Sequence, residues 1–145
     1  MANNLLEEIV LVRKKNLERA KEQVPLDRMI TRARGARKPV SLTESIAVPD
    51  RLTIIAEMKR KSPSAGVILA DYSPAKIAEL YERNGAGALS VLTEEDYFGG
   101  SPEHIGEVKG ASGLPVLRKD FTVDPYQIYE AMALGASAVL LITAI

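Results

Sequence analysis

The stretch SPAKIAELYERNGAGALSVLT, residues 73–93, contains a complete helix followed by a strand. Ser73-Pro74 is typical of a helix start, because a proline at the first helical position lacks only an N–H that would have had no partner. Asn84-Gly85 is predicted to end the helix, since glycine readily adopts the left-handed backbone found there. The segment ALSVLT that follows predicts a strand over residues 88–93.

The same unit recurs on both sides of this stretch. Strands are predicted over residues 53–59, 115–120 and 138–143, and helices beginning at Ser101-Pro102 and Asp124-Pro125 lie between them. Glycines at 110–113 and at 135 are predicted to end these helices. Strand–helix alternation of this kind indicates parallel strands joined by right-handed crossovers. We therefore predict an α/β fold.

Residues 1–50 have a different pattern. Leu5, Ile9, Val12 and Leu17 recur at roughly helical spacing among many charges, and a second short helix is predicted over residues 26–34. Gly35 and Pro39 then interrupt the helical pattern. We divide the chain into a helical N-terminal extension, residues 1–50, and an α/β part, residues 51–145.

The α/β part is expected to be the first half of a (β/α)₈ barrel. Its predicted strands start at residues 53, 88, 115 and 138, and the last of them is an apolar segment that would need cover on both faces. At the same spacing, eight such units and the extension would need roughly 270 residues, which is an ordinary size for this barrel. Only the first four strands are expected in this chain.

Composition narrows the class of function. The 145 residues are 46% hydrophobic and 26% charged, as in soluble globular proteins. Nineteen basic residues balance nineteen acidic ones, so the charge gives no reason to expect nucleic-acid or membrane-surface binding. A local basic stretch, residues 28–38, has no aromatic residues and is interpreted as a solvated face.

Rare residue types exclude several chemistries. The sequence has no cysteine and a single histidine, His104, which excludes disulfides, thiolate chemistry, histidine metal clusters and a Ser-His-Asp triad. His104 itself is interpreted as a surface residue. The N-terminal apolar run is too short and too acidic for a signal peptide, and no segment reaches the roughly 18 apolar residues of a membrane span. A cytoplasmic protein is expected.

The first predicted strand ends in alternating charges, IIAEMKRKSPSAG over residues 54–66. Residues two apart share a face of a strand, so Glu57 and Lys59 point to one side while Ile54, Ala56 and Met58 point to the other. The carboxyl end of a parallel strand is where α/β proteins place their ligand chemistry. The alternative is a solvated ion pair on an edge strand.

The third predicted strand, in PVLRKDF over residues 115–121, also ends in a lysine. Lys119 and Phe121 share one face, whereas Arg118 and Asp120 share the other. A lysine at the mouth of a low-dielectric barrel is suited to donate a proton. The alternative is that Lys119 only forms an ion pair with Glu57 or Asp120.

Two loops give weaker indications of ligand binding. In TEEDYFGGS, residues 93–101, Phe98 can form an apolar lid with Gly99-Gly100 as its joints, but a plain turn with solvated acids explains the loop equally well. In the loop after the first strand, Ser62, Ser64 and Gly66 offer hydroxyls and amides suited to an anion. A proline-containing turn alone is weak evidence for phosphate binding.

Taken together, IIAEMKRKSPSAGVI, TEEDYFGGS and PVLRKDF lie in order at three successive strand ends and closely resemble indole-3-glycerol-phosphate synthase of tryptophan biosynthesis. The resemblance runs from about residue 5 to the C-terminus and includes the helical extension. It implies a (β/α)₈ carboxy-lyase without cofactor or metal. The reaction closes the pyrrole ring of the phosphorylated small molecule 1-(2-carboxyphenylamino)-1-deoxyribulose 5-phosphate, with loss of carbon dioxide and water.

The resemblance also assigns roles to individual residues. Lys119 matches the general acid of the family. Lys59 matches a lysine near the anionic groups of the substrate that also assists dehydration, and Glu57 matches the carboxylate that positions it. Ser62, Phe98 and Phe121 match substrate-binding positions, the two phenylalanines holding the aromatic ring of the substrate.

The remaining functional residues of the family fall on strands five to eight and cannot be assigned here. They include a glutamate base and the phosphate-binding loops, so this chain alone is expected to be inactive. Two alternatives stay open. One is a related phosphosugar isomerase on the same scaffold, and the other is a non-catalytic half-barrel that pairs with the missing half or with a second copy of itself through its exposed strand edges.

Overall fold

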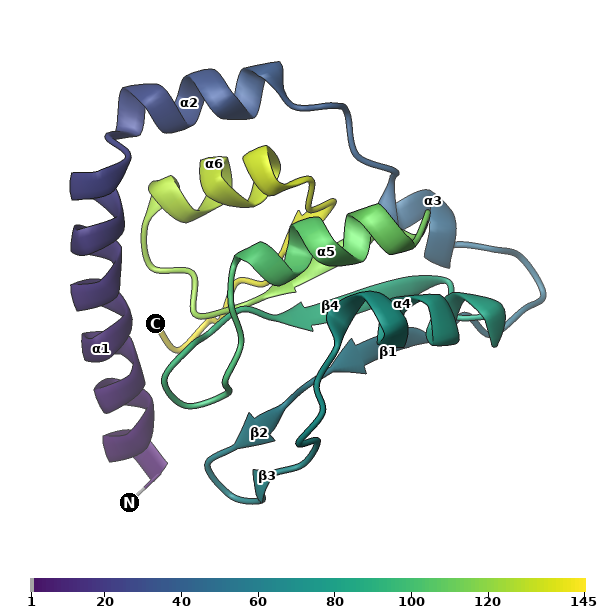
Figure 1. Ribbon diagram of the computed structural model, residues 1–145, viewed down its shortest axis with the longest axis horizontal. Coiled ribbons are helices and arrows are strands. Elements are labelled where there is room, and N and C mark those ends of the chain that lie inside the picture. The colour runs from purple at the N-terminus through teal and green to yellow at the C-terminus, as the bar shows by residue number, and fades with distance from the viewer. Residues whose placement is uncertain (1) are drawn as a thin grey trace.

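The computed structural model describes residues 2–145 (Figure 1). Three helices come first, two of which the sequence predicts. From residue 55 onward strands alternate with helices as predicted, apart from two short strands in the loop after the first strand. The elements are α1 (Ala2–Gln23), α2 (Leu26–Gly35), α3 (Leu42–Ile46), β1 (Ile55–Met58), β2 (Lys61–Ser62), β3 (Gly66–Val67), α4 (Pro74–Arg83), β4 (Ala88–Leu92), α5 (Glu103–Ala111), β5 (Val116–Lys119), α6 (Pro125–Leu134) and β6 (Ala138–Val139).

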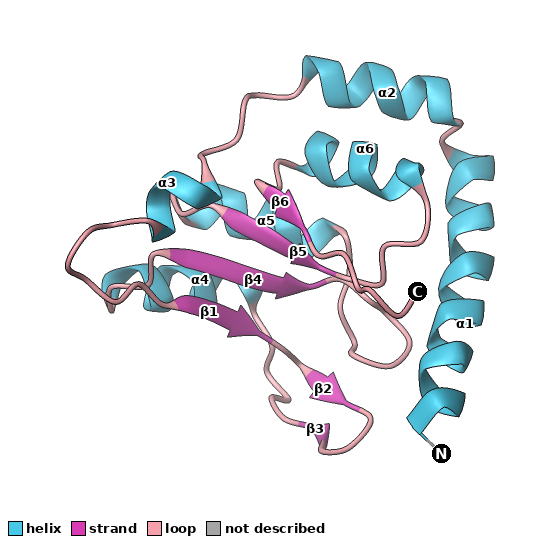
Figure 2. Cartoon of the chain, turned by 180° about the vertical axis from the view of Figure 1, so that it is seen from behind, coloured by secondary structure: helices cyan, strands magenta, loops and turns pink. Residues whose placement is uncertain are grey.

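Four parallel strands form the main sheet in the order β1-β4-β5-β6, which is also their order along the chain. Helices α4, α5 and α6 lie on one face of this sheet, and the view from behind in Figure 2 shows the strands in front of them. No helix covers the opposite face among the residues that the structure describes. Sequential parallel strands with helices on one side are the arrangement of successive units in a (β/α)₈ barrel.

The core lies between the sheet and these helices. Alternate strand residues point into it, including Met58 of β1, Leu89 and Val91 of β4, and Val116 of β5. They pack against apolar residues of the three helices, among them Ala78, Ile105, Val108 and Ala131. Burial of this continuous apolar layer holds the units together, while the other set of alternate residues faces away from the helices.

Helix α1 lies across the carboxyl end of the sheet, and α2 packs against α6 (Figure 2). Side-chain contacts hold α1 there: Asn16 donates to the Asp96 carboxylate over 2.7 Å, and Lys21 pairs with Asp124 at 2.9 Å. The buried hydroxyl of Tyr126 donates to carbonyl oxygens of Ala20 and Val24 at the end of α1. The N-terminal helix therefore covers the end of the sheet where a barrel places its active site.

The predicted helix boundaries need three corrections. Asp124 caps α6 by accepting from the Tyr126 N–H, but Ser73 makes no capping hydrogen bond, and α5 begins at Glu103, with Pro102 and not Ser101 at its N-cap position. Gly85 and Gly135 adopt positive φ angles of 88° and 90° after their helices, as predicted. Helix α5 instead ends in the extended backbone of Ser112, so glycine does not stop it.

Two strand residues and His104 also differ from the sequence prediction. Ile54 precedes β1 and is 64% exposed, although its spacing placed it on the packed face. Strand β6 pairs with β5 over only two residues, and Leu141 beyond it is left exposed. His104 is half-buried against the Tyr72 ring, with centroids 5.4 Å apart, and burial lowers its pKa.

Two short elements have no counterpart in the sequence prediction. Helix α3 is five residues long and is capped by Ser41, whose hydroxyl accepts from the Glu44 N–H. Strands β2 and β3 form a small antiparallel hairpin in the loop after β1, where the sequence indicated only a Ser-Pro-Ser turn. Neither is long enough to show a periodic apolar pattern.

Candidate active site

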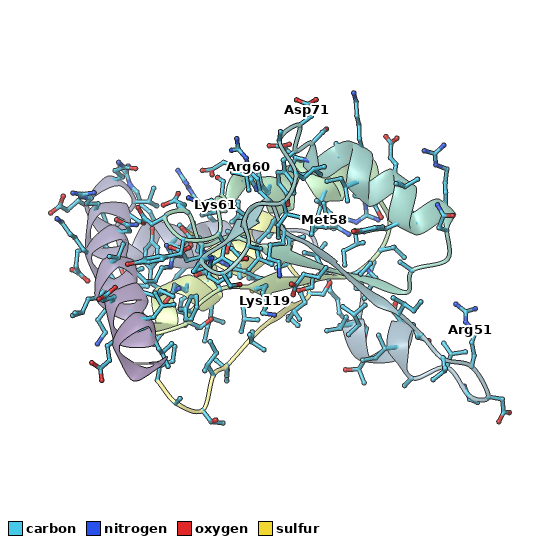
Figure 3. The ribbon with its side chains drawn as sticks, turned by 90° about the horizontal axis from the view of Figure 1, so that it is seen from below. Arg51, Met58, Arg60, Lys61, Asp71 and Lys119 are labelled. Atoms are coloured by element: carbon cyan, nitrogen blue, oxygen red, sulfur yellow. The ribbon has the colours of Figure 1, made fainter. Side chains whose placement is uncertain are left out.

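An open cavity of about 220 Å³ lies on the helix-free face of the sheet, at the carboxyl ends of its strands. Its lining combines charged and apolar groups from all four strands or the loops that follow them. The residues are Glu57, Lys59, Leu92, Phe98, Lys119, Asp120, Phe121, Leu140 and Ile142. Five of the six predicted site residues therefore meet here, and Figure 3 shows Lys119 near the middle of the molecule.

The carboxylate of Glu57 lies between two ammonium groups. Lys119 Nζ donates to Glu57 Oε2 over 2.9 Å, and Lys59 Nζ lies 3.6 Å from Glu57 Oε1. The three side chains are 35 to 37% exposed, so each keeps contact with the open cavity. The arrangement holds two proton-bearing cations side by side at one carboxylate.

Aromatic rings form a wall of the cavity beside these charges. The rings of Phe98 and Phe121 come from loops after neighbouring strands, and their centroids lie 6.1 Å apart at an angle of 37°. Leu92, Leu140 and Ile142 add aliphatic surface. An apolar slot next to charged groups suits a planar ring that carries an ionic substituent.

A buried acid builds the loop that carries Phe98. The carboxylate of Glu94, 1% exposed, accepts from the backbone N–H groups of Asp96, Tyr97 and Phe98. Gly100 closes the loop so tightly that a Cβ there would lie 2.4 Å from the Leu92 carbonyl oxygen. Glu94 is thus a structural acid and not a solvated one, and the glycines form a fixed turn.

Ser62 lies outside the cavity lining. It sits in the β2–β3 hairpin, where its hydroxyl accepts from the Ala65 N–H over 3.1 Å and lies 3.4 Å from the Ser64 hydroxyl. The neighbouring Lys61 binds the loop after β4: its Nζ donates to the Asp96 carbonyl over 2.7 Å and its N–H to the Phe98 carbonyl over 3.3 Å. Figure 3 shows Arg60 and Lys61 on this hairpin side of the molecule.

Sequence reasoning missed a buried charged network next to the cavity. Arg118, 1% exposed, pairs with Asp120 at 3.1 Å and with Glu130 of α6 at 2.7 Å. Arg13 of α1 also reaches Asp120, at 2.9 Å. The spacing in α1 does indicate that Arg13 is buried, because Ile9, Arg13 and Leu17 lie four residues apart on the buried stripe of this helix.

Ser90 of β4 is a second residue that the sequence did not single out. It pairs in register with Glu57 and Leu117, and it is 4% exposed. Its hydroxyl has no hydrogen-bond partner among the described residues. Alternation along β4 puts it on the face of Glu57 and Lys119, a position that could have been read from the strand pattern.

Two negative findings concern residues 2–145 only. They contain no group of three or more His, Asp or Glu side chains arranged to hold a metal ion. Within the same range, no helix is long and apolar enough to cross a membrane.

Comparison with known proteins identifies the family. The family model described as indole-3-glycerol phosphate synthase matches residues 6–145. The chain belongs to the indole-3-glycerol phosphate synthase family. Its α/β fold is accordingly of the (β/α)₈ barrel class, of which the described residues provide four parallel strands in barrel order.

Curated indole-3-glycerol phosphate synthases are similar over nearly the whole chain. The protein of Carboxydothermus hydrogenoformans is 46% identical over 146 residues, covering 97% of this chain and 55% of the relative. That of Neisseria meningitidis serogroup B is 45% identical, with the same two shares. That of Rhodopirellula baltica is 42% identical, covering 95% of this chain and 53% of the relative. The chain therefore spans about half the length of the curated relatives it matches.

Proposed function

We propose that this chain supplies the proton-donating half of an indole-3-glycerol phosphate synthase active site. The observation that carries the proposal is the cluster of Lys119, Glu57 and Lys59 beside the aromatic wall, in a chain that belongs to this family. The substrate would be 1-(2-carboxyphenylamino)-1-deoxyribulose 5-phosphate. It has a planar ring for the apolar slot and a carboxylate for the cations.

In the first step, the ring carbon that bears the carboxylate attacks the ketone carbon, and a carbon–carbon bond forms. The ketone oxygen gains negative charge, and Lys119 transfers a proton to it, giving an alcohol. Loss of carbon dioxide returns the electrons of the broken bond to the ring system. The hydroxyl group then leaves as water after Lys59 protonates it, and loss of a ring-system proton completes the indole.

Glu57 would hold both lysine side chains in place and aimed at the cavity. Its contacts with Lys119 at 2.9 Å and Lys59 at 3.6 Å support this role, since a carboxylate attracts and orients neighbouring ammonium groups. Phe98 and Phe121 would hold the aromatic ring of the substrate so that its attacking carbon is aligned with the ketone carbon. Such alignment can lower the activation barrier by several kcal/mol. Ser62 would act from the hairpin at the rim of the site.

The division at residue 50 into an extension and a half-barrel belongs to the same proposal. It is supported by the all-helical content before that point and by the parallel sheet after it. Phosphate sites in these barrels usually form after strands seven and eight, which follow the four strands described here. We therefore propose that the phosphate of the substrate is bound by residues beyond this chain. A cytoplasmic location is part of the proposal.

The proposal is tested in a fusion protein. This chain is joined to the remaining C-terminal part of the Carboxydothermus hydrogenoformans relative, and conversion of the substrate is followed by the rise of indole fluorescence. Turnover is expected, because the two parts together restore a full-length protein of the family. A folded fusion protein that binds the substrate but forms no indole would refute the proposed function.

A further inference from the structure

The carboxylate of Asp120 is the centre of the buried network next to the candidate site. Its Oδ2 accepts from Thr93 Oγ1 at 2.6 Å, from an Arg13 nitrogen at 2.9 Å and from an Arg118 nitrogen at 3.1 Å. Its Oδ1 accepts from the Phe121 N–H at 2.8 Å. Asp120 is 2% exposed, so all four hydrogen bonds are shielded from water and are strengthened by the low local dielectric.

Asp120 lies between two residues of the cavity. Lys119 and Phe121 both line it, and Lys119 reaches Glu57 across the sheet. Arg118 binds the carboxylate of Asp120 from the helical side of the sheet. This arginine is buried under α6 and also donates to the Gln127 carbonyl. The segment that carries the proposed proton donor is therefore fixed through the residue next to it.

The balance of charges in this buried network argues against a purely stabilising role for it. Two guanidinium groups, Arg13 and Arg118, are matched by two carboxylates, Asp120 and Glu130. Removing such charges from water costs several kcal/mol per ion, and apolar residues of similar volume often stabilise a protein equally well or better. A network of this kind at the edge of a cavity is better explained by a need for fixed geometry.

We propose that Asp120 is a positioning residue for Lys119, and that Arg13 anchors it to α1. The proposal rests on the proposed function, in which Lys119 donates the proton. Through Arg13, separated from Asp120 by 107 residues in sequence, the N-terminal helix acts on the geometry of the site without touching the substrate. Misplacement of a reacting group by about 1 Å can cost on the order of 100-fold in rate.

The test compares Asp120→Asn with Glu130→Gln in the fusion protein described above. Both variants neutralise one carboxylate that pairs with the same Arg118 nitrogen, but only Asp120 also bonds the Phe121 N–H. For Asp120→Asn, kcat is expected to fall about tenfold or more while KM changes less than about threefold. For Glu130→Gln, both constants should stay within about twofold of the parent.

A second measurement needs no turnover. Hydrogen exchange of the Phe121 amide, measured in this chain and in its Asp120→Asn variant, is expected to become about tenfold faster in the variant. Exchange of the Val91 amide, in the core of β4, should not change. Comparison of the two amides distinguishes local loosening at the site from a general loss of stability.

Equal losses of kcat in Asp120→Asn and Glu130→Gln would overturn the proposal, because they would indicate a structural role for the whole network. Unchanged kcat in Asp120→Asn would overturn it as well. If the parent fusion protein is itself inactive, the proposed function fails first. The role of Asp120 is then decided by hydrogen exchange, and equal exchange of Phe121 in parent and variant would overturn it.

Discussion

At the scale of single residues, Glu57 joins the charged groups of the candidate site. Its carboxylate contacts the ammonium groups of both Lys119 and Lys59, and all three side chains are about one-third exposed. Exposed ion pairs contribute little to stability. We therefore expect substitutions of these residues to affect turnover far more than the free energy of unfolding.

Lys119→Met is expected to lower kcat of the fusion protein about 100-fold or more, since loss of a positioned general acid typically costs that much. Indole fluorescence under saturating substrate gives the rate. Lys76→Met is the matched control, because it removes an exposed lysine of α4 on the helical face. Turnover of Lys119→Met equal to that of the control would contradict the role of Lys119.

Gly100 and Gly106 give a matched test of the loop that carries Phe98. A Cβ at Gly100 would lie 2.4 Å from the Leu92 carbonyl oxygen, whereas one at Gly106 in α5 meets nothing within 4 Å. Gly100→Ala should lower the free energy of unfolding of this chain by about 2 kcal/mol. Gly106→Ala should raise it by up to about 1 kcal/mol. Urea denaturation measures both, and equal stability of the two variants would disprove the account of the loop.

The face alternation of single strands was the most dependable residue-level signal. It correctly predicted that Glu57 and Lys59 share one side of the first strand and that Arg118 lies opposite Lys119. The buried role of Glu94 could not be predicted, because an acid that binds backbone N–H groups and an acid in water look alike in a sequence.

At the scale of elements, the junction between α1 and α6 holds the N-terminal helix on the sheet. Asp124 joins the two helices, since it caps α6 through the Tyr126 N–H and pairs with Lys21 of α1. The hydrogen bond from Lys21, followed by the one from the Tyr126 N–H, lowers the pKa of Asp124 below its ordinary value.

Asp124→Ala tests this junction through its pH dependence. Because the pKa of Asp124 is lower in the folded chain than the ordinary value of 3.8, its contribution is present above that pH and is lost as the pH falls through the folded-state value. The variant should be less stable by about 1 kcal/mol at neutral pH. Urea denaturation from pH 7 to pH 3 should show the difference shrinking below about pH 4. A difference that stays constant over this range would contradict the assignment.

The helices and strands that the sequence predicts are those bounded by proline or glycine residues. The predicted strands and the helices between them are all present in the structure, and positive-φ glycines follow α4 and α6, although α5 ends without one. The position of α1 over the carboxyl end of the sheet was not predictable, because it depends on Arg13, a charge on an otherwise apolar stripe, and on its distant partner Asp120. The β2–β3 hairpin depends likewise on contacts with another loop.

At the scale of the whole molecule, the helix-free face of the sheet and its edge strands β1 and β6 expose apolar residues. Ile55 and Leu141 are 41% and 69% exposed there. The chain also spans about half the length of its curated relatives. We predict that the chain alone shows no measurable turnover, and steady-state assays at high protein concentration would reveal any activity that contradicts this.

The most direct test of the central claim, that this chain carries a competent half of the site, is complementation. The chain, the separately expressed C-terminal part of the Carboxydothermus hydrogenoformans relative, and their mixture are each given the carboxyphenylamino-deoxyribulose phosphate, and indole fluorescence is recorded. We predict a rise only in the mixture, and its loss when the chain carries Lys119→Met. Equal rates with and without that substitution, or no activity in a mixture whose parts bind each other, would contradict the claim.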